Sequence, residues 1–252
     1  VSQSSEAQAV IFDTQNPVFS SVQVSPNPAR AGPTVLTFVS SKTLETNPVV
    51  TVNNNPALFS SLNNLTYTYT YEVTNNDLQG TAAVQIQGID LAGNPGSKSA
   101  NFIIDTIYPV VSNVAVSPNP AKAGTLVLTF EVSETLAANP LVKINSETAT
   151  FSRRFPTPTD LNYEYTYNVT SSDQQGQAVI SISATDLANN LTTQQANNLL
   201  VIDTVAPVVS NVAVSPNPAK AGLVTIDFAV SENLLSDPVV TVNGSAAAKQ
   251  QV

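Results

Sequence analysis

The chain has 252 residues, with eighteen acidic and nine basic side chains, a formal net charge of −9, and neither cysteine nor histidine. Nucleic-acid binding needs clustered Lys and Arg, and the only such cluster is Arg153 and Arg154, so we expect no nucleic-acid partner. Without Cys or His the chain can form no disulfide, thiolate metal site or catalytic triad, and we expect it not to be an enzyme. No run approaches the roughly 18 apolar residues of a transmembrane helix, so no membrane span is expected in this sequence.

One phrase occurs three times along the chain. VSPNPARAG begins at Val24, and VSPNPAKAG begins at Val116 and again at Val214. An IDT-like motif precedes each copy, and its aspartates at 13, 105 and 203 lie 92 and 98 residues apart. This spacing is the length of one β-sandwich domain and is too long for a solenoid unit. The repeat is therefore predicted to be a domain.

The register of the repeats predicts the domain boundaries. Residues 1–13 match the last strand of a domain, 14–105 and 106–203 are two complete domains, and 204–252 form the N-terminal half of a third. We therefore expect the sequence to be a window on a longer protein.

Within the first complete repeat, period-two alternation of apolar residues predicts seven strands and almost no helix. We place them at 17–25, 34–41, 49–53, a short strand near Leu58, 65–74, 81–90 and 99–105. The VSPNP phrase falls between the first two strands, where its prolines cannot donate to a sheet and its glycine permits unusual backbone angles. The second repeat has four extra residues around RRFPTPTD and two more before its last strand, and we expect both insertions in loops.

The fifth strand of each repeat carries a row of tyrosines. In LTYTYTYEVT, the side chains of Leu65, Tyr67, Tyr69, Tyr71 and Val73 share one face, and LNYEYTYNVT repeats the pattern. Exposed tyrosines would suit a carbohydrate-binding surface. The flanking Leu and Val and the absence of Trp favour a buried core strand instead.

The motifs VQIQGIDLAGN and ISISATDLANN, each followed by a strand ending in IDTxxPVV, resemble the tandem bacterial immunoglobulin-like domains of surface-layer proteins and adhesin stalks. This resemblance covers the whole chain. It implies all-β, seven-stranded Greek-key sandwiches strung end to end as a rod, on the cell surface, in the cell wall or otherwise outside the cell. It also implies calcium at domain junctions, as members of that family often bind it there.

The strand order allows the calcium expectation to be located. Because successive strands alternate in direction, the second-to-third and sixth-to-seventh loops meet the incoming linker at one end of the sandwich. In the second repeat this gathers Asp105, Glu134 and Asp186, with Asn190 as a candidate carbonyl ligand. Oxygen ligands from several loops suit calcium, which accepts six to eight oxygens in irregular geometry. The alternative is that these acids only cap their own turns.

The other repeats depart from this set. In the first, Asp13 and Asp90 match but Lys42 stands where the glutamate is expected, so an ammonium could neutralise the two carboxylates and a calcium ion there is doubtful. The third repeat offers Asp203 and Glu232 without the remaining loop.

Four Asn-x-Ser/Thr sequons are candidate glycosylation sites, although this composition produces about that many by chance. They are Asn64, Asn168, Asn190 and Asn243.

Linkers such as DTIYPVV contain no glycine, so consecutive sandwiches should form a fairly stiff rod. The leading hypothesis is a structural extracellular protein that builds a prokaryotic surface layer or cell-surface filament, with copies of itself or other surface proteins as partners. One alternative is an adhesin stalk that spaces a binding tip from the cell. Another makes these the accessory domains of a secreted polysaccharide-degrading enzyme.

Overall fold

The structure is a computed structural model and describes residues 12–250. Every regular element in this range is a β-strand, so the predicted all-β class is confirmed. None of the described residues forms a helix that could cross a membrane. The strand expected over residues 1–13 lies almost wholly outside the described part of the chain.

Residues 19–104 form one sandwich of two antiparallel sheets. Its strands are β1 (Phe19–Ser25), β2 (Gly32–Ser40), β3 (Val49–Val52), β4 (Asn55–Pro56), β5 (Leu58–Asn63), β6 (Thr66–Val73), β7 (Gly80–Ile89) and β8 (Pro95–Ile104). One sheet has the order β1-β2-β6-β5 and the other β4-β3-β7-β8. With β4 as a short extra strand beside β3, this is the strand order of an immunoglobulin-like sandwich.

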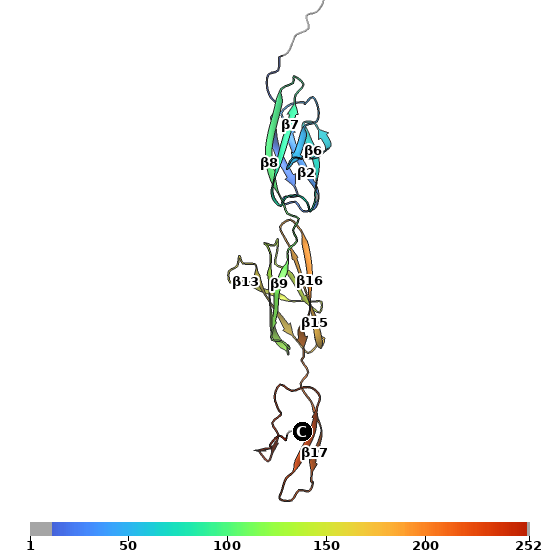
Figure 1. The fold of residues 1–252 in the computed structure, drawn as a ribbon, viewed down its shortest axis with the longest axis vertical. Helices are drawn as coiled ribbons and strands as arrows, with labels where there is room; N and C mark the ends of the chain where they lie inside the picture. Colours follow the sequence, from blue (N-terminus) through green and yellow to red (C-terminus); the bar gives the residue numbers. More distant parts are fainter. Residues whose placement is uncertain (1–11, 251–252) are drawn as a thin grey trace, which may run out of the picture.

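Residues 111–202 repeat the same arrangement. The strands are β9 (Val111–Ser117), β10 (Gly124–Val132), β11 (Leu141–Ile144), β12 (Glu147–Thr148), β13 (Thr150–Phe155), β14 (Asn162–Val169), β15 (Gly176–Thr185) and β16 (Leu191–Ile202). The sheets are β13-β14-β10-β9 and β12-β11-β15-β16. Farther along, β17 (Val209–Ser215) pairs with β18 (Thr225–Val230), and β19 (Thr241–Val242) with β20 (Ser245–Ala246). Figure 1 shows the two sandwiches and this third segment following one another along one line.

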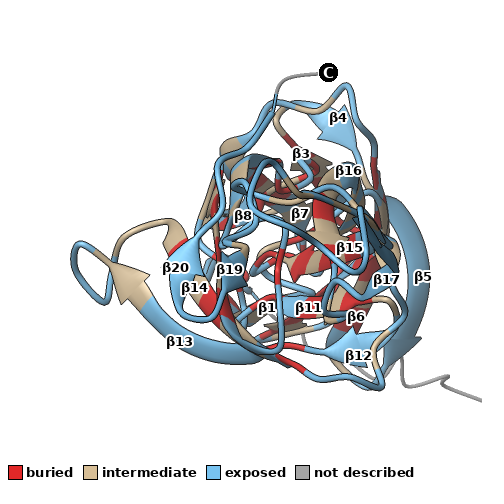
Figure 2. Ribbon diagram, turned by 90° about the horizontal axis from the view of Figure 1, so that it is seen from below, coloured by how far each residue is buried: buried red, intermediate tan, exposed pale blue. Residues whose placement is uncertain are grey.

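Each sandwich has its own core of buried residues between its two sheets. Figure 2 shows the buried residues, in red, along the strands toward the middle of the view. Tyr67, Tyr69 and Tyr71 are buried as predicted, with 3%, 2% and 7% of their surface exposed. The ring of Phe38 stacks against Tyr67 and Tyr69, with centroid distances of 5.5 and 5.8 Å. Burial raises the pKa of Tyr69 to about 12. The tyrosine row is therefore core, and a sugar-binding platform on this strand is ruled out.

The repeated proline phrase connects β1 to β2 of the same sheet and on its way touches the edge of the opposite sheet. After β1 it crosses to the edge of β8, where the Ala29 amide donates to the Ile103 carbonyl at 2.8 Å and the Ala29 carbonyl accepts from Asp105 at 2.9 Å. The Asn27 carboxamide oxygen accepts from the Ile103 amide at 2.9 Å. Ala121 makes the same contacts in the second sandwich. Because the prolines have no N–H to donate, the backbone of this phrase bonds to the edge of β8 through Ala29, with Asn27 adding a side-chain contact.

The short strand predicted near Leu58 is β5, which pairs with β6 over Leu58–Asn63. Two other sequence-based expectations about the strands were wrong. The last strand begins at Pro95 instead of 99, because its pairing with β7 continues to Ile89. The two extra residues before the last strand of the second sandwich lie inside β16: Ala178 of β15 pairs with Leu200 and Ile180 pairs with Ala196, so β16 bulges between them.

Candidate metal centre

The linker between the two sandwiches is fixed at both of its ends. At its start, the Gln79 side chain donates to the Thr106 hydroxyl at 3.0 Å and accepts from the Thr106 amide at 2.8 Å. At its end, the Val110 amide donates to the Ser133 hydroxyl at 2.9 Å, and the Val110 carbonyl accepts from the Ser133 amide at 3.0 Å. The second contact places the residue after Ser133, Glu134, beside the linker.

Asp186 is fully buried in the turn between β15 and β16. Its Oδ1 accepts from the backbone amides of Ala188 and Asn190, each at 2.8 Å. Its Oδ2 accepts from the Asn190 side chain at 2.8 Å. Asp186 therefore caps its own turn, as the alternative interpretation expects, and it also keeps one carboxylate oxygen beside the linker.

Asn190 has a different role from the predicted one. It is 2% exposed, and its Nδ2 donates to the linker carbonyls of Asp105 at 2.9 Å and Ile107 at 3.1 Å as well as to Asp186. It thus acts as a donor that ties the turn to the linker, and we correct its prediction as a carbonyl ligand. A glycan needs that same nitrogen, so Asn190 is also wrong as a glycosylation candidate in the folded domain.

Glu134 faces this linker without a hydrogen-bond partner. Its Oε1 is buried and contacts no donor among the described residues. Burial raises the pKa of the Glu134 carboxyl, and the negative charges of Asp105 and Asp186 add to that rise. A buried carboxylate oxygen without a donor is costly, so this position calls for a cation or a proton.

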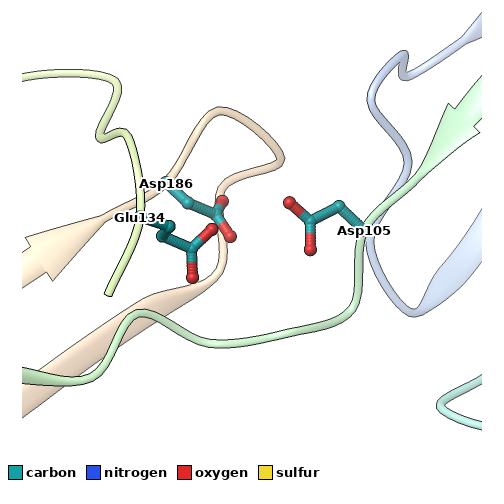
Figure 3. A group of neighbouring side chains, drawn as sticks. All are labelled: Asp105, Glu134 and Asp186. Atoms are coloured by element: carbon teal, nitrogen blue, oxygen red, sulfur yellow. The ribbon is translucent and has the colours of Figure 1, made fainter. Parts of the chain in front are cut away.

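The three predicted acids come together at the junction. One carboxylate oxygen from each of Asp105, Glu134 and Asp186 lies within 4.8 Å of the others. Figure 3 shows Asp105 reaching from the linker toward Asp186 and Glu134, which come from two different loops. A cavity of about 390 Å³, lined in part by Asp105, Ile107 and Glu134, adjoins them. These ligands are all hard oxygens, and calcium accepts such a set with irregular geometry.

The corresponding place in the first sandwich is filled by an ammonium. Lys42 Nζ donates to Asp13 Oδ1 and Oδ2 at 3.0 and 2.8 Å, to Asp90 Oδ2 at 3.0 Å and to the Gln15 carbonyl. The hydrogen bonds that Lys42 donates to Asp13 lower the pKa of the Asp13 carboxyl and raise the pKa of the Lys42 ammonium. Burial by itself would raise the pKa of Asp90, but hydrogen bonds from Asn94 and Lys42 lower that pKa well below its usual range. The structure thus pairs Asp13 and Asp90 with an ammonium, at the position where the sequence made a calcium ion doubtful.

In the third segment, Glu232 repeats the behaviour of Glu134. Its Oε1 is buried and has no hydrogen-bond partner among the described residues. Asp203 accepts from the Val205 amide at 3.2 Å, as Asp105 does from Ile107 at 3.1 Å. Two of the three carboxylates are therefore present at this junction.

The remaining sequons are accessible. Asn64, Asn168 and Asn243 are exposed, and Asn64 and Asn243 lie in turns with φ of 55° and 49°. They stay predictions.

Two junction residues were not found from the sequence. The Ile107 carbonyl corresponds to the Gln15 carbonyl that Lys42 contacts, which makes it a further candidate oxygen ligand. Arg30 donates from its guanidinium to the Asn189 carbonyl at 2.9 Å, across the junction between the sandwiches. Only the conserved spacing of the repeats could have pointed to Ile107. No sequence signal pointed to Arg30, because the contact crosses two domains.

A larger cavity lies away from the acids, along the first sandwich. It measures about 760 Å³ and is lined by residues that include Pro17, Val49, Gly88, Gly96 and Lys98. A Cβ at Gly96 would lie 2.2 Å from the Pro17 carbonyl oxygen, so only glycine fits there. The second sandwich has alanine and threonine at the corresponding positions 184 and 192. None of the residues that line this cavity is Asp or Glu.

No protein-family model and no curated protein matches this chain. Among solved structures, a calcium-stabilised adhesin of an ice-binding Antarctic bacterium is 13% identical with a TM-score of 0.44, and the match covers 80% of this chain and 52% of that one. A 1.5-MDa bacterial ice-binding adhesin is 16% identical with a TM-score of 0.47, covering 75% of this chain and 65% of that one. The I9–I11 tandem of titin is 8% identical with a TM-score of 0.36, and the match covers 91% of this chain and 83% of that one. The matches thus cover about half and about two thirds of the two adhesin chains whose structures were solved.

Proposed function

Since the chain is a tandem of immunoglobulin-like sandwiches, we propose that it is a structural, non-catalytic rod of an extracellular protein, stiffened by calcium at the junction of its two complete domains. Such a rod spaces one part of a cell-surface protein from another, as in an adhesin stalk. Its setting would be the cell surface or the cell wall, where calcium is plentiful.

One observation carries this proposal: three carboxylates from the linker and two loops converge within 4.8 Å, and one of their buried oxygens has no donor. A cation bound there would join the linker to the second sandwich and relieve the repulsion among the acids. Magnesium demands near-ideal octahedral geometry, whereas calcium tolerates ligands drawn from separate loops. Calcium sites of extracellular modules typically have dissociation constants of about 10⁻⁴–10⁻³ M.

The test is a calcium titration of the whole chain by isothermal calorimetry, with small-angle scattering to follow its length. We expect saturable binding in the extracellular concentration range and a longer, better defined particle with calcium than with EDTA. Glu134→Gln should abolish both effects. Glu147→Gln is the matched control, because Glu147 is exposed in the same domain and makes the same charge change. Equal binding by both variants would contradict the proposed site.

A second candidate function is lateral assembly into a surface layer or filament, with copies of the chain as partners. It is favoured by β5, an edge strand whose residues are all exposed and uncharged, including Leu58 and Leu62 at 72% and 47% exposure. Unprotected edges of this kind can pair with another sheet. Its counterpart β13 carries Arg153 and Arg154, which discourage such pairing. Analytical ultracentrifugation of Leu62→Lys tests this: self-association of the wild type that the variant lacks supports it, and a monomeric wild type at high concentration contradicts it.

A further inference from the structure

We propose that the ammonium of Lys42 takes the place of a divalent ion at the upstream end of the first sandwich. Metal binding would then fix the junction between the two domains but not the segment that leads into the first domain. This inference rests on the proposed calcium site at Asp105, Glu134 and Asp186.

The ammonium of Lys42 occupies the position of a bound ion. It contacts both carboxylate oxygens of Asp13, Oδ2 of Asp90 and the Gln15 carbonyl, which are oxygens from the linker and from a distant loop. Asp90 is 1% exposed. Lys42 therefore joins the incoming segment to the sandwich through oxygen ligands alone, as a metal ion would.

The two sites share the hydrogen bonds that hold their linkers. Asn94 Nδ2 donates to the Asp13 carbonyl at 3.0 Å, just as Asn190 Nδ2 donates to the Asp105 carbonyl at 2.9 Å. Val18 and Ser41 form the same pair of contacts as Val110 and Ser133, with both distances at 2.9 Å. The acid-bearing scaffold is thus built in the same way whether or not an ammonium is present.

The charges of the two sites match only when the second holds a divalent ion. Lys42, Asp13 and Asp90 sum to a charge of −1. Asp105, Glu134 and Asp186 sum to −3 when ionised, and a divalent cation restores −1. Replacing lysine by glutamate changes the charge by two, which is the charge that calcium supplies.

Two substitutions exchange the two kinds of junction. Lys42→Glu recreates at Asp13 and Asp90 the acid set of the second sandwich, and Glu134→Lys recreates at Asp105 and Asp186 the ammonium of the first. Lys143→Glu is the matched control, because it makes the charge change of Lys42→Glu on β11, away from both sites. Each variant is made in the whole chain and titrated with calcium chloride.

We expect Lys42→Glu to bind one calcium ion more than the wild type and Glu134→Lys to bind one fewer. Lys143→Glu should match the wild type. Hydrogen exchange follows each linker separately, since the Gln15 amide donates to Asp13 and the Ile107 amide to Asp105. In the wild type, EDTA should speed exchange around Ile107 by about tenfold and leave Gln15 unchanged. Lys42→Glu should make Gln15 calcium-dependent, and Glu134→Lys should protect Ile107 in EDTA.

The result that overturns this inference is a Lys42→Glu chain that gains no ion and keeps Gln15 protected in EDTA, while the wild type binds calcium at Asp105. If the wild type and Glu134→Gln bind the same number of ions, the proposed calcium site is wrong. Lys42→Met then judges the role of Lys42 by itself: faster exchange at Gln15 in EDTA supports the ammonium as the group that holds the segment, and unchanged exchange rejects it.

Discussion

Glu134→Gln is expected to make the second sandwich more stable when calcium is absent and less stable when calcium is present. Most substitutions at a partly buried, ordered residue destabilise a domain, so the first sign is unusual. It follows from the three carboxylates at the junction, whose charges repel one another without a cation.

The magnitude follows from the 4.8 Å upper bound on the separation of the three oxygens. Two unit charges at that distance repel by about 3.5 kcal/mol at an effective dielectric constant of about 20, and by about 0.9 kcal/mol in bulk water. Because the glutamate is only partly buried, solvent screening brings the net gain from removing its charge to about 1–2 kcal/mol. That gain corresponds to a rise in Tm of about 5–15 °C for a domain of about 100 residues.

Calcium should reverse the order of stability, so that the wild type becomes more stable than Glu134→Gln. At a concentration of about 100 times the dissociation constant, the ion stabilises the wild type by about 2.7 kcal/mol. The glutamine variant should gain almost nothing. Differential scanning calorimetry in EDTA and in calcium measures both effects, and the first sandwich, whose acids are paired with Lys42, is the internal reference. A variant that unfolds at a lower temperature than the wild type in EDTA would refute the repulsion argument.

Three further predictions concern the sandwiches and the linker. Phe130→Ala should cost about 3–5 kcal/mol in urea unfolding, because that ring is 2% exposed and stacked between two tyrosines, and a cost below about 1 kcal/mol would contradict this. Gln79→Ala removes both hydrogen bonds to Thr106, so hydrogen exchange at the Thr106 amide should become faster. An unchanged exchange rate would show that these two hydrogen bonds do not hold the linker. Burial by itself would raise the pKa of Asp173, but a hydrogen bond from Tyr167 holds that pKa below 3.8. The ionised Asp173 therefore stabilises the domain fully above pH 3.8, and this stabilisation is lost as pH falls through the lowered pKa. Acid unfolding of Asp173→Asn should therefore lack that component, and an unaltered pH profile would argue against it.

The tyrosine strands were predictable because alternation by itself decides which face of a strand is apolar. The meeting of Asp105, Glu134 and Asp186 was predictable as well, since alternating strand directions bring those loops to one end. The extent of β5 and β8 was not, because pairing with a neighbour lengthens a strand beyond its own apolar pattern. The role of Asn190 was missed for a similar reason: the linker carbonyls to which it donates are more than eighty residues away.

The amino-acid sequence alone determined that this protein is a string of sandwich domains, because period-two patterns and the repeat length are local properties of the chain. It also determined the charge difference between Lys42 and Glu134. Only the tertiary structure decided that the ammonium reaches both Asp13 and Asp90, and that Glu134 keeps a buried oxygen without a donor. Those outcomes depend on distances between loops from separate strands, which follow from how the two sheets and the linker come together in space.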